Sequence, residues 1–318
     1  MMAGVTSVFV SAVLPVLAIA GAGYLLRRAR PVDVEPLNAV TLYVFLPALA
    51  AHSLLSSELG GDLLRLLVAI LVFSAVTFAI ALAVGRAIGE SGSRLSALVF
   101  VAALPNVGNF GIPVSTFAFG ALGGTVAVMF TVVQGVLNYT AGVYVAAWGT
   151  GEAWRARMGR VFRLPLVYVV VLAVAVRAAG GVPPADGTAM QTLELVGNAS
   201  IPTFLLVLGI QLAETEPAAA LRETVPAIGL RFLVAPVVGV GVALLVGFGD
   251  PAVARTFVLL TAAPAAITPL VLLVEFAGDS DRSPTAPEYH GTAVFVSTLL
   301  SIPVVTGVIV LLRSGVLV

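Results

Sequence analysis

The sequence predicts an all-α integral membrane protein with ten transmembrane helices, arranged as two inverted repeats of five, in which the fourth and ninth helices are broken and cross. Hydrophobic residues make up 59% of the 318 positions and charged residues only 10%, and the mean hydropathy is +1.10. A soluble domain has about a quarter of its residues charged. Apolar runs long enough to span a bilayer recur along the chain. Two of them are interrupted at mid-span by proline and glycine.

The charged and sulfur-containing residues exclude several classes of function. The basic residues are all arginine, and 16 of them balance 16 acidic residues, so no excess charge attracts nucleic acid. The chain has no cysteine and two histidines, which leaves no disulfide and no pattern typical of a His/Cys metal site. We therefore expect no metal, no cofactor and no nucleic-acid partner.

Ten apolar segments fit the length of a spanning helix, about 20 residues. The first is interpreted as a helix and not as a signal peptide, because its arginines follow the apolar run. The linkers at 149–163 and 278–289 are too short for a soluble domain. The expected helices cover residues 5–26, 36–55, 63–88, 94–119, 123–148, 164–180, 190–213, 224–248, 252–277 and 290–313.

The arginines also predict an orientation, because cytoplasmic loops retain positive charge during insertion. Most of them lie after expected helices 1, 3, 5, 7 and 9, which places those loops in the cytoplasm and both termini outside a multi-pass protein of the cell membrane. Arg231 lies a few residues into the eighth helix, where we expect it to snorkel to the cytoplasmic face. The arginines assigned to the cytoplasmic loops are residues 27, 28, 30, 86, 94, 155, 157, 160, 163, 222 and 282.

The two halves of the chain resemble each other weakly. Residues 64–69 read Leu-Arg-Leu-Leu-Val-Ala and residues 230–235 read Leu-Arg-Phe-Leu-Val-Ala. Because each half holds five helices, an odd number, the second half must insert upside down relative to the first. We therefore divide the chain into a first repeat, residues 1–150, and an inverted second repeat, residues 151–318.

The first break, Leu104–Pro113, reads Leu-Pro-Asn-Val-Gly-Asn-Phe-Gly-Ile-Pro. Proline lacks an amide hydrogen and glycine gains freedom on unwinding, so a regular helix cannot continue through it. Unwound backbone survives in hydrocarbon only where it is buried in protein or lines a cavity. Asn106 and Asn109 are therefore candidate ligand-binding residues. The alternative is that they only satisfy the freed backbone.

The second break, residues 263–269, reads Ala-Pro-Ala-Ala-Ile-Thr-Pro. If the two breaks meet, the half-helices beginning near Ile112 and Pro269 present free amide groups to one point, which favours an anion. Thr268 adds a hydroxyl, unless it too only satisfies backbone. Neither break contains Asp or Glu, which disfavours sodium or proton coupling through a carboxylate there, although backbone carbonyls could still hold an ion.

Other polar residues in the apolar segments are weaker candidates. Gln134 and Asn138 are four residues apart and share a helix face, where they line the cavity or join helices, with equal support. His52, Glu194 and Glu275 are candidate proton carriers. Because Glu194 and Glu275 lie near the ends of their segments, an interfacial position is the better interpretation for both.

These residues resemble the auxin efflux carriers of plants and their bacterial and archaeal relatives. The resemblance covers nearly the whole chain. The long cytoplasmic loop of many plant members is reduced to about fifteen residues here. The matching features are Pro105–Asn106 with Gly111–Ile112–Pro113, Pro264 and Pro269 with Glu275–Phe276, Asn38 through Pro47 to His52, Gln134, and Thr292 to Pro303.

The resemblance implies a fold shared with bile-acid:sodium symporters. Expected helices 1, 2, 6 and 7 would form a scaffold through which the protein dimerises, and helices 3–5 and 8–10 a transport domain that moves like an elevator. It also implies small organic acids, such as malate or malonate, as substrates. The residues implied at the substrate are Pro105, Asn106, Pro264, Ile267 and Pro269, within a candidate site that also includes Asn109, Gly111, Pro113, Gln134, Asn138 and Thr268.

The leading hypothesis is a secondary transporter of small organic anions. The first alternative is a sodium-coupled symporter on the same fold, and the second is a non-transporting membrane sensor. An enzyme is the weakest hypothesis, because His52 and His290 lie in unrelated segments without a nucleophile or an acidic cluster beside them.

Overall fold

The computed structural model describes residues 9–56, 61–146, 165–214, 221–276 and 284–315, and the regular elements within these ranges are all helical. They comprise α-helices and short π-helical turns, the latter labelled η. In chain order they are η1 (Phe9–Val13), α2 (Leu14–Ala29), α3 (Val34–Val40), η2 (Thr41–Phe45), α4 (Leu46–Ser56), α5 (Asp62–Ala87), α6 (Gly92–Ala103), η3 (Val107–Gly111), α7 (Ile112–Leu137), η4 (Asn138–Gly142), α8 (Val143–Ala146), α9 (Pro165–Ala178), α10 (Thr188–Asn198), α11 (Ser200–Glu214), α12 (Val225–Gly229), η7 (Leu230–Val234), α13 (Ala235–Val246), α14 (Pro251–Thr261), α15 (Thr268–Phe276) and α16 (Ala286–Arg313).

Helix is present in each of the ten predicted ranges, although the helices differ in length. Three apolar helices, Gly92–Ala103, Pro165–Ala178 and Pro251–Thr261, are shorter than a bilayer span. The described residues are thus those of a helical, multi-pass membrane protein, and ten crossings in two inverted repeats stay a prediction. The six helices long and apolar enough to cross a membrane are Val34–Ser56, Asp62–Ala87, Val107–Leu137, Thr188–Glu214, Val225–Val246 and Ala286–Arg313.

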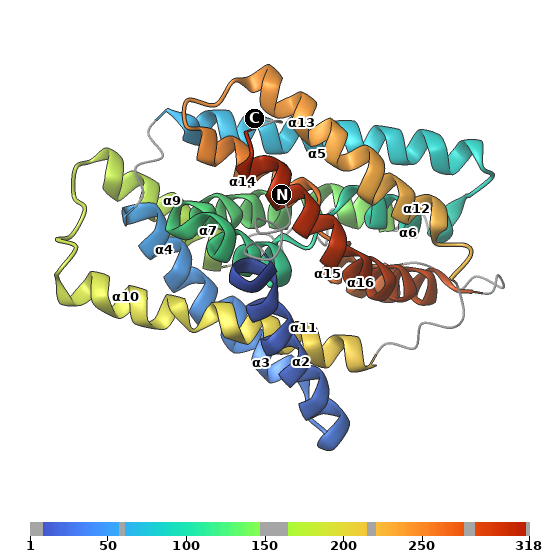
Figure 1. Ribbon diagram of the computed structural model, residues 1–318, viewed down its shortest axis with the longest axis horizontal. Helices are drawn as coiled ribbons and strands as arrows, with labels where there is room; N and C mark the ends of the chain where they lie inside the picture. The colour runs from blue at the N-terminus through green and yellow to red at the C-terminus, as the bar shows by residue number, and fades with distance from the viewer. Residues whose placement is uncertain (1–8, 57–60, 147–164, 215–220, 277–283, 316–318) are drawn as a thin grey trace.

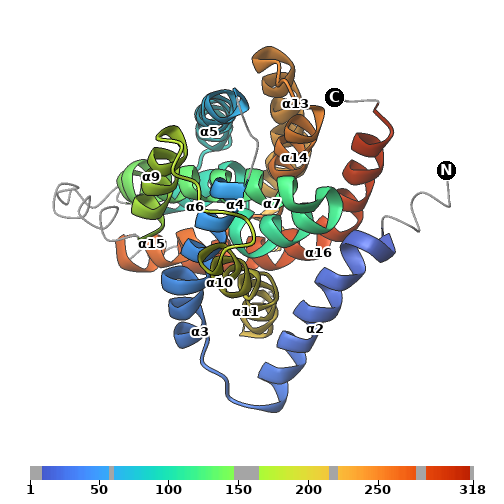
Figure 2. The ribbon, with the colours of Figure 1, turned by 90° about the vertical axis from the view of Figure 1, so that its left-hand side faces the viewer.

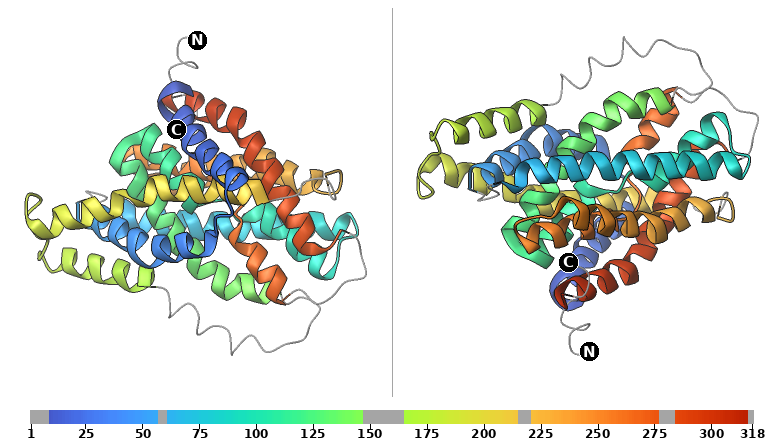
Figure 3. Two further views of the ribbon diagram at one scale, coloured as in Figure 1. Left: turned by 90° about the horizontal axis from the view of Figure 1, so that it is seen from below. Right: turned by 90° about the horizontal axis from the view of Figure 1, so that it is seen from above.

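The helices form two groups with the broken segments between them. Figures 1 and 2 show α5, α13 and α14 on one side of the molecule and α2, α3, α10 and α11 on the other, with α6, α7, α15 and α16 between. Figure 3 shows α5 running beside α12 and α13 when seen from above, and α5 packs on α13. The breaks therefore lie at the centre of the molecule.

Glycines let α2 and α11 approach each other at backbone distance. A Cβ added at Gly209 would lie 1.8 Å from the carbonyl oxygen of Ala20, and one at Gly23 would lie 2.3 Å from that of Leu206. Small residues at such contacts are typical of membrane helix pairs, because lipid supplies no hydrophobic force and close backbone packing must hold the helices together. The α2–α11 pair is thus a tightly packed unit.

The starts of the helices around the breaks follow local signals in the sequence. The Asp250 carboxylate accepts a hydrogen bond from the Ala252 amide at 2.7 Å, with Pro251 in the first turn of α14, and Thr285 and Glu288 form a capping box at the start of α16. Gly120, at φ 71° and ψ −158°, turns the chain sharply inside α7. Only glycine adopts this conformation without strain, so the first half-helix after the break ends there.

The two breaks pair with each other. The backbone amide of Asn106 donates to the Pro264 carbonyl oxygen at 2.7 Å, and the backbone amide of Ala266 donates to the Leu104 carbonyl oxygen at 2.9 Å. These bonds form an isolated antiparallel bridge between Pro105 and Ala265. Unwound backbone in hydrocarbon needs such partners, because no water reaches it. Each break therefore satisfies the polar groups that the other exposes.

Arg231 joins the half-helices that lead into the two breaks. Its guanidinium donates to the carbonyl oxygen of Ala102 at 3.0 Å, at the end of α6, and to the carbonyl oxygen of Thr261, at the end of α14. The residue is 0% exposed, and it forms no ion pair with a described acidic residue. The expectation that Arg231 snorkels to the membrane surface is therefore wrong. Its charge instead compensates the negative ends of two helix dipoles.

Substituting Gly209 tests the packing of α2 on α11. We expect Gly209→Ala to lower the midpoint of thermal unfolding of the purified protein, because the new methyl group overlaps the backbone of α2. Overpacking of this kind costs about 1–3 kcal/mol. Gly21→Ala is the matched control, because an added Cβ there meets nothing within 4 Å. Equal melting of the two variants would contradict the described contact.

Substituting Arg231 tests its role between the half-helices. We expect Arg231→Met to lower the melting temperature strongly, because hydrogen bonds from a charged donor are each worth about 1.5–3 kcal/mol and two buried carbonyls lose their partner. Arg231→Lys should lose less.

The control for this substitution is Arg65→Met. Arg65 lies in the similar stretch of the first half of the sequence, but its side chain is 48% exposed and pairs with Asp62 at the start of α5. Equal melting temperatures of the Arg231→Met and Arg65→Met variants would show that the buried guanidinium is dispensable.

Candidate functional site

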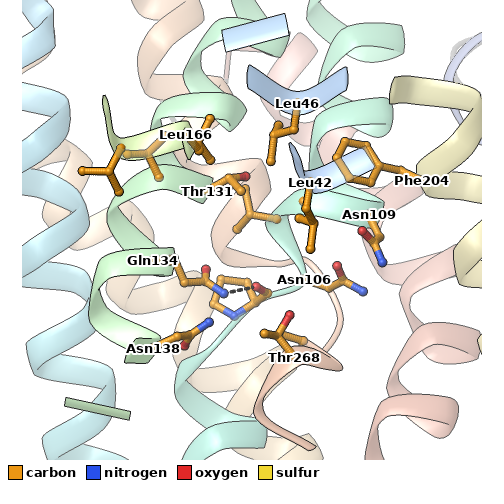
Figure 4. A pocket seen from close by; sticks show the side chains of 17 residues that line it. Leu42, Leu46, Asn106, Asn109, Thr131, Gln134, Asn138, Leu166, Phe204 and Thr268 are labelled. Atoms are coloured by element: carbon orange, nitrogen blue, oxygen red, sulfur yellow. Dashed lines mark hydrogen bonds between the residues drawn. The ribbon is translucent and has the colours of Figure 1, made fainter. Parts of the chain in front are cut away.

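A cavity of about 140 Å³ lies against the first break. Its wall combines the break itself, the far end of α7, the start of α15 and apolar side chains from η2, α4, α9 and α11, as Figure 4 shows. The residues that line it are Leu42, Leu46, Pro105, Asn106, Val107, Gly108, Asn109, Thr131, Val132, Gln134, Gly135, Asn138, Leu166, Val167, Phe204, Ala266 and Thr268.

The polar residues expected at the site gather in this cavity. In Figure 4, Gln134 and Asn138 lie on one side, Asn106 and Asn109 on the other, and Thr268 lies below Asn106. Asn106, Gln134 and Asn138 are buried, whereas Thr268 is exposed. The sequence alone left open whether Gln134 and Asn138 face a cavity, and the structure places both at its wall.

The remaining residues of the expected site shape the breaks and do not line the cavity. Pro113, Pro264 and Pro269 are buried and Ile267 is half-buried. Gly111 is where η3 approaches α14, since an added Cβ would lie 2.7 Å from Cδ2 of Leu260. These five residues were expected to contact a substrate, but none of them belongs to the wall of this cavity.

The helix after the first break begins earlier than the sequence suggested. It resumes at Val107, in the π-helical turn η3, and not near Ile112. The Val107 amide donates to the Pro105 carbonyl oxygen and the Gly111 amide to that of Asn106, both at 2.9 Å. The amides of the first helical turn have no acceptor within the helix, and Gly108 and Asn109 belong to the cavity wall. The positive end of this helix therefore faces the cavity.

The start of α15 contributes less than expected. Pro269 has no amide hydrogen, and the Leu270 amide already donates to the Ile267 carbonyl oxygen at 2.9 Å. Only Thr268 of this helix start reaches the cavity. The pair of helix ends predicted to face an anion is thus unequal, and the first break supplies most of the donors.

Gln134 connects the cavity to the break. Its Nε2 donates to the Pro105 carbonyl oxygen at 2.7 Å, as the dashed line in Figure 4 marks. Because that oxygen also accepts from the Val107 amide, both of its lone pairs are used. The side chain of Gln134 therefore helps to hold the unwound segment in place.

Two polar side chains of α16 support the second break, and the sequence alone did not indicate this role. Nε2 of His290 lies 2.9 Å from the Ala266 carbonyl oxygen, and Oγ of Ser297 accepts from the Ala265 amide at 3.1 Å. Because a carbonyl oxygen only accepts, Nε2 carries the proton of the ring. His290 begins an apolar segment, and its relation to residue 266 appears only once the chain is folded.

Two of the candidate proton carriers, His52 and Glu194, lie apart from the cavity at the first break. His52 and Glu194 line a second cavity of about 520 Å³, together with Asp250 and residues of α4 and α7. Glu194 is exposed. The Glu275 side chain lies outside the described residues. Among the described residues, the wall of the first cavity includes no Asp or Glu, so its polar character comes from amides, the hydroxyls of Thr131 and Thr268, and backbone.

The chain is similar in sequence to membrane transport proteins. The chain matches the family described as "Membrane transport protein" over residues 8–161 and 153–309. It is 27% identical over 295 residues to a protein of Methanothermobacter thermautotrophicus called "Uncharacterized transporter", with 91% of this chain and 94% of that protein covered. The chain therefore belongs to the membrane transport family that includes the auxin efflux carriers.

Proposed function

We propose that the protein is a secondary transporter that binds a small organic anion at the paired breaks. One observation carries the proposal: a helix start and the side-chain amide of Asn106 meet at a central cavity, and none of the described residues in its wall is acidic. A carboxylate is favoured at a helix start by the free amides and by the dipole. Neutral donors around it add no charge of their own that must be desolvated.

The buried cation behind the breaks supports an anionic guest. Arg231 lies between the C-terminal ends of α6 and α14, so the two negative helix ends are balanced without a bound ion. A bound cation at these helix ends would have to compete with the guanidinium of Arg231 for the same carbonyl oxygens. A monoanion at the start of η3 fits this distribution of charge.

The same observation disfavours the sodium-coupled alternative. In many carriers the coupling ion binds to unwound carbonyls and to half-helix C-terminal ends. Here the guanidinium of Arg231 holds such carbonyls at both half-helices. We infer that transport does not need sodium.

Two contacts made by acidic side chains support an inverted repeat. Asp62, at the start of α5, accepts hydrogen bonds at 2.8 Å from the amides of Gly249 and Asp250, just before α14. Glu223, just before α12, pairs with Arg94 near the start of α6. In each case an acid at the start of the third helix of one half binds near the start of the fourth helix of the other. An in-plane pseudo-twofold axis would generate this arrangement from two crossing helices.

A scaffold and a moving unit fit the packing. Contacts link α2 to α11, α11 to α10, α10 to α4 and α4 to α9, whereas α5, α6, α13, α14 and α16 form a second set of contacts. The aromatic rings of Phe73, Phe130 and Phe257 tie α5, α7 and α14 together, with centroids 6.0–6.1 Å apart. We propose that the set formed by α5, α6, α13, α14 and α16, together with α7, is the moving unit and carries the breaks past the scaffold like an elevator. The protein forms a homodimer joined through the scaffold, with both termini outside the cell.

The positions of the two cavities fit this motion of the guest. Both lie between α4 and α7: the first reaches Leu46 and the second begins at Leu49. These positions are about 4.5 Å apart along a helix. A shift of α7 along α4 would move a guest from one cavity toward the other.

Asn106 variants test the proposed site. In proteoliposomes, we expect Asn106→Ala to reduce uptake of labelled C3–C5 carboxylates at least about tenfold, because a donor beside the anion is lost. Asn106→Asp should reduce uptake further, since it adds a like charge at equal size. Asn38→Ala, which removes the same side chain in α3 away from the cavity, is the control. Undiminished uptake by the Asn106→Asp variant would rule out an anion at this position.

Replacing sodium with choline tests the coupling. The initial rate should change by less than about twofold, because no sodium ion has to bind at the carbonyls that Arg231 occupies. The parent protein and Arg65→Met should behave alike. A rate that collapses without sodium would favour the symporter instead.

A further inference from the structure

Three amides in the cavity wall have atoms without a hydrogen-bond partner. Asn106, Gln134 and Asn138 are 5%, 6% and 5% exposed. Nδ2 of Asn106, Oε1 of Gln134 and Oδ1 of Asn138 have no partner in the described part of the chain. Leaving a buried polar atom unpaired costs about 1–3 kcal/mol, so a guest that pairs with these atoms is favoured over one that does not.

The orientation of the Gln134 amide follows from its neighbour. The Pro105 carbonyl oxygen can only accept, so the NH₂ group of Gln134 must face it. Oε1 then points away from Pro105, on the other side of the planar amide. A carboxylate cannot satisfy this oxygen, because both groups are acceptors.

The donors and the acceptor lie at opposite sides of the cavity. Figure 4 shows Gln134 and Asn138 on one side and Asn106 and Asn109 on the other, with the Asn106 side chain directed toward Asn109. The positive start of η3 lies on the Asn106 side. A guest whose carboxylate lies there extends its other end toward Gln134.

The size of the cavity limits the guest. At about 140 Å³ it compares with an engineered cavity of about 150 Å³ in another protein that holds benzene, which suggests a guest of roughly six to ten heavy atoms. Leu42, Leu46, Leu166 and Phe204 provide an apolar wall for its carbon skeleton. A short carbon chain therefore fits between the two polar sides.

We propose that the site selects small carboxylates that carry a second group able to donate a hydrogen bond, such as a hydroxyl, and that Gln134 is the residue that determines this specificity. The proposal rests on the proposed function, because the carboxylate is bound at the same site. The donor hydrogen pairs with Oε1 of Gln134. A guest without a donor leaves that oxygen unpaired, which is the situation in which a polar site discriminates best.

The test compares guests that differ in one group. Butanoate, its 3- and 4-hydroxy derivatives and the corresponding methoxy acids are titrated against the purified full-length protein, and affinity is taken from the thermal stabilisation that each produces. We expect the better hydroxy acid to bind at least about tenfold more tightly than butanoate, and its methoxy counterpart to lose that gain. This comparison needs no variant.

Gln134→Met then tests the assignment to one residue. It should bring the ratio between hydroxy acid and butanoate to within about twofold. Thr140→Val is the control, because the Thr140 hydroxyl bonds within its own helix to the Val136 carbonyl oxygen and is not part of the cavity wall. It should keep the parent's ratio.

The outcomes separate the two proposals. Equal binding of butanoate and both hydroxy acids, or of hydroxy and methoxy acids, overturns the requirement for a donor and leaves the carboxylate site standing. A preference that persists in Gln134→Met overturns the role of Gln134. If no carboxylate stabilises the parent protein, the proposed function falls together with this inference.

Discussion

The need to satisfy unwound backbone inside a membrane governs the centre of this molecule. Leu104, Asn106, Pro264 and Ala266 exchange two backbone hydrogen bonds, and neither break could be buried in hydrocarbon without the other. Gln134 and Ser297 bond to the same segments from neighbouring helices. The prolines that stop each helix thus require a set of polar partners at mid-membrane, and one of these partners, Gln134, belongs to the wall of a cavity.

Arg231 completes this arrangement electrostatically. Four half-helices meet at the breaks, and the negative ends of two of them are bonded to one guanidinium. The positive start of η3 remains directed at the cavity. A site built this way has a fixed positive bias, and no titratable acid belongs to the described part of its wall. We infer that it binds anions through backbone and neutral amides, and that its selectivity comes from the arrangement of donors and acceptors around them.

Much of this centre could be predicted from the sequence, because prolines and glycines clustered within an apolar run stop a regular helix. The breaks, Asn106 and the shared face of Gln134 and Asn138 were identified in this way. The sequence shows Arg231 as a charge inside an apolar segment. A snorkelling arginine and a buried one give the same sequence pattern, so only the folded chain shows that Arg231 lies beside residues 102 and 261. The start of η3 at Val107 was missed because a π-helical turn has no clear sequence signal. His290 and Ser297 depend on contacts between distant segments.

The most direct test of the central claim is a high-resolution structure of the purified protein bound to a small hydroxycarboxylate. We predict density for the guest between Asn106 and Gln134, with its carboxylate at the first turn of η3 and Arg231 still bonded to α6 and α14. Density for the acid in the cavity lined by His52 and Glu194, with the space beside Asn106 empty, would contradict the account.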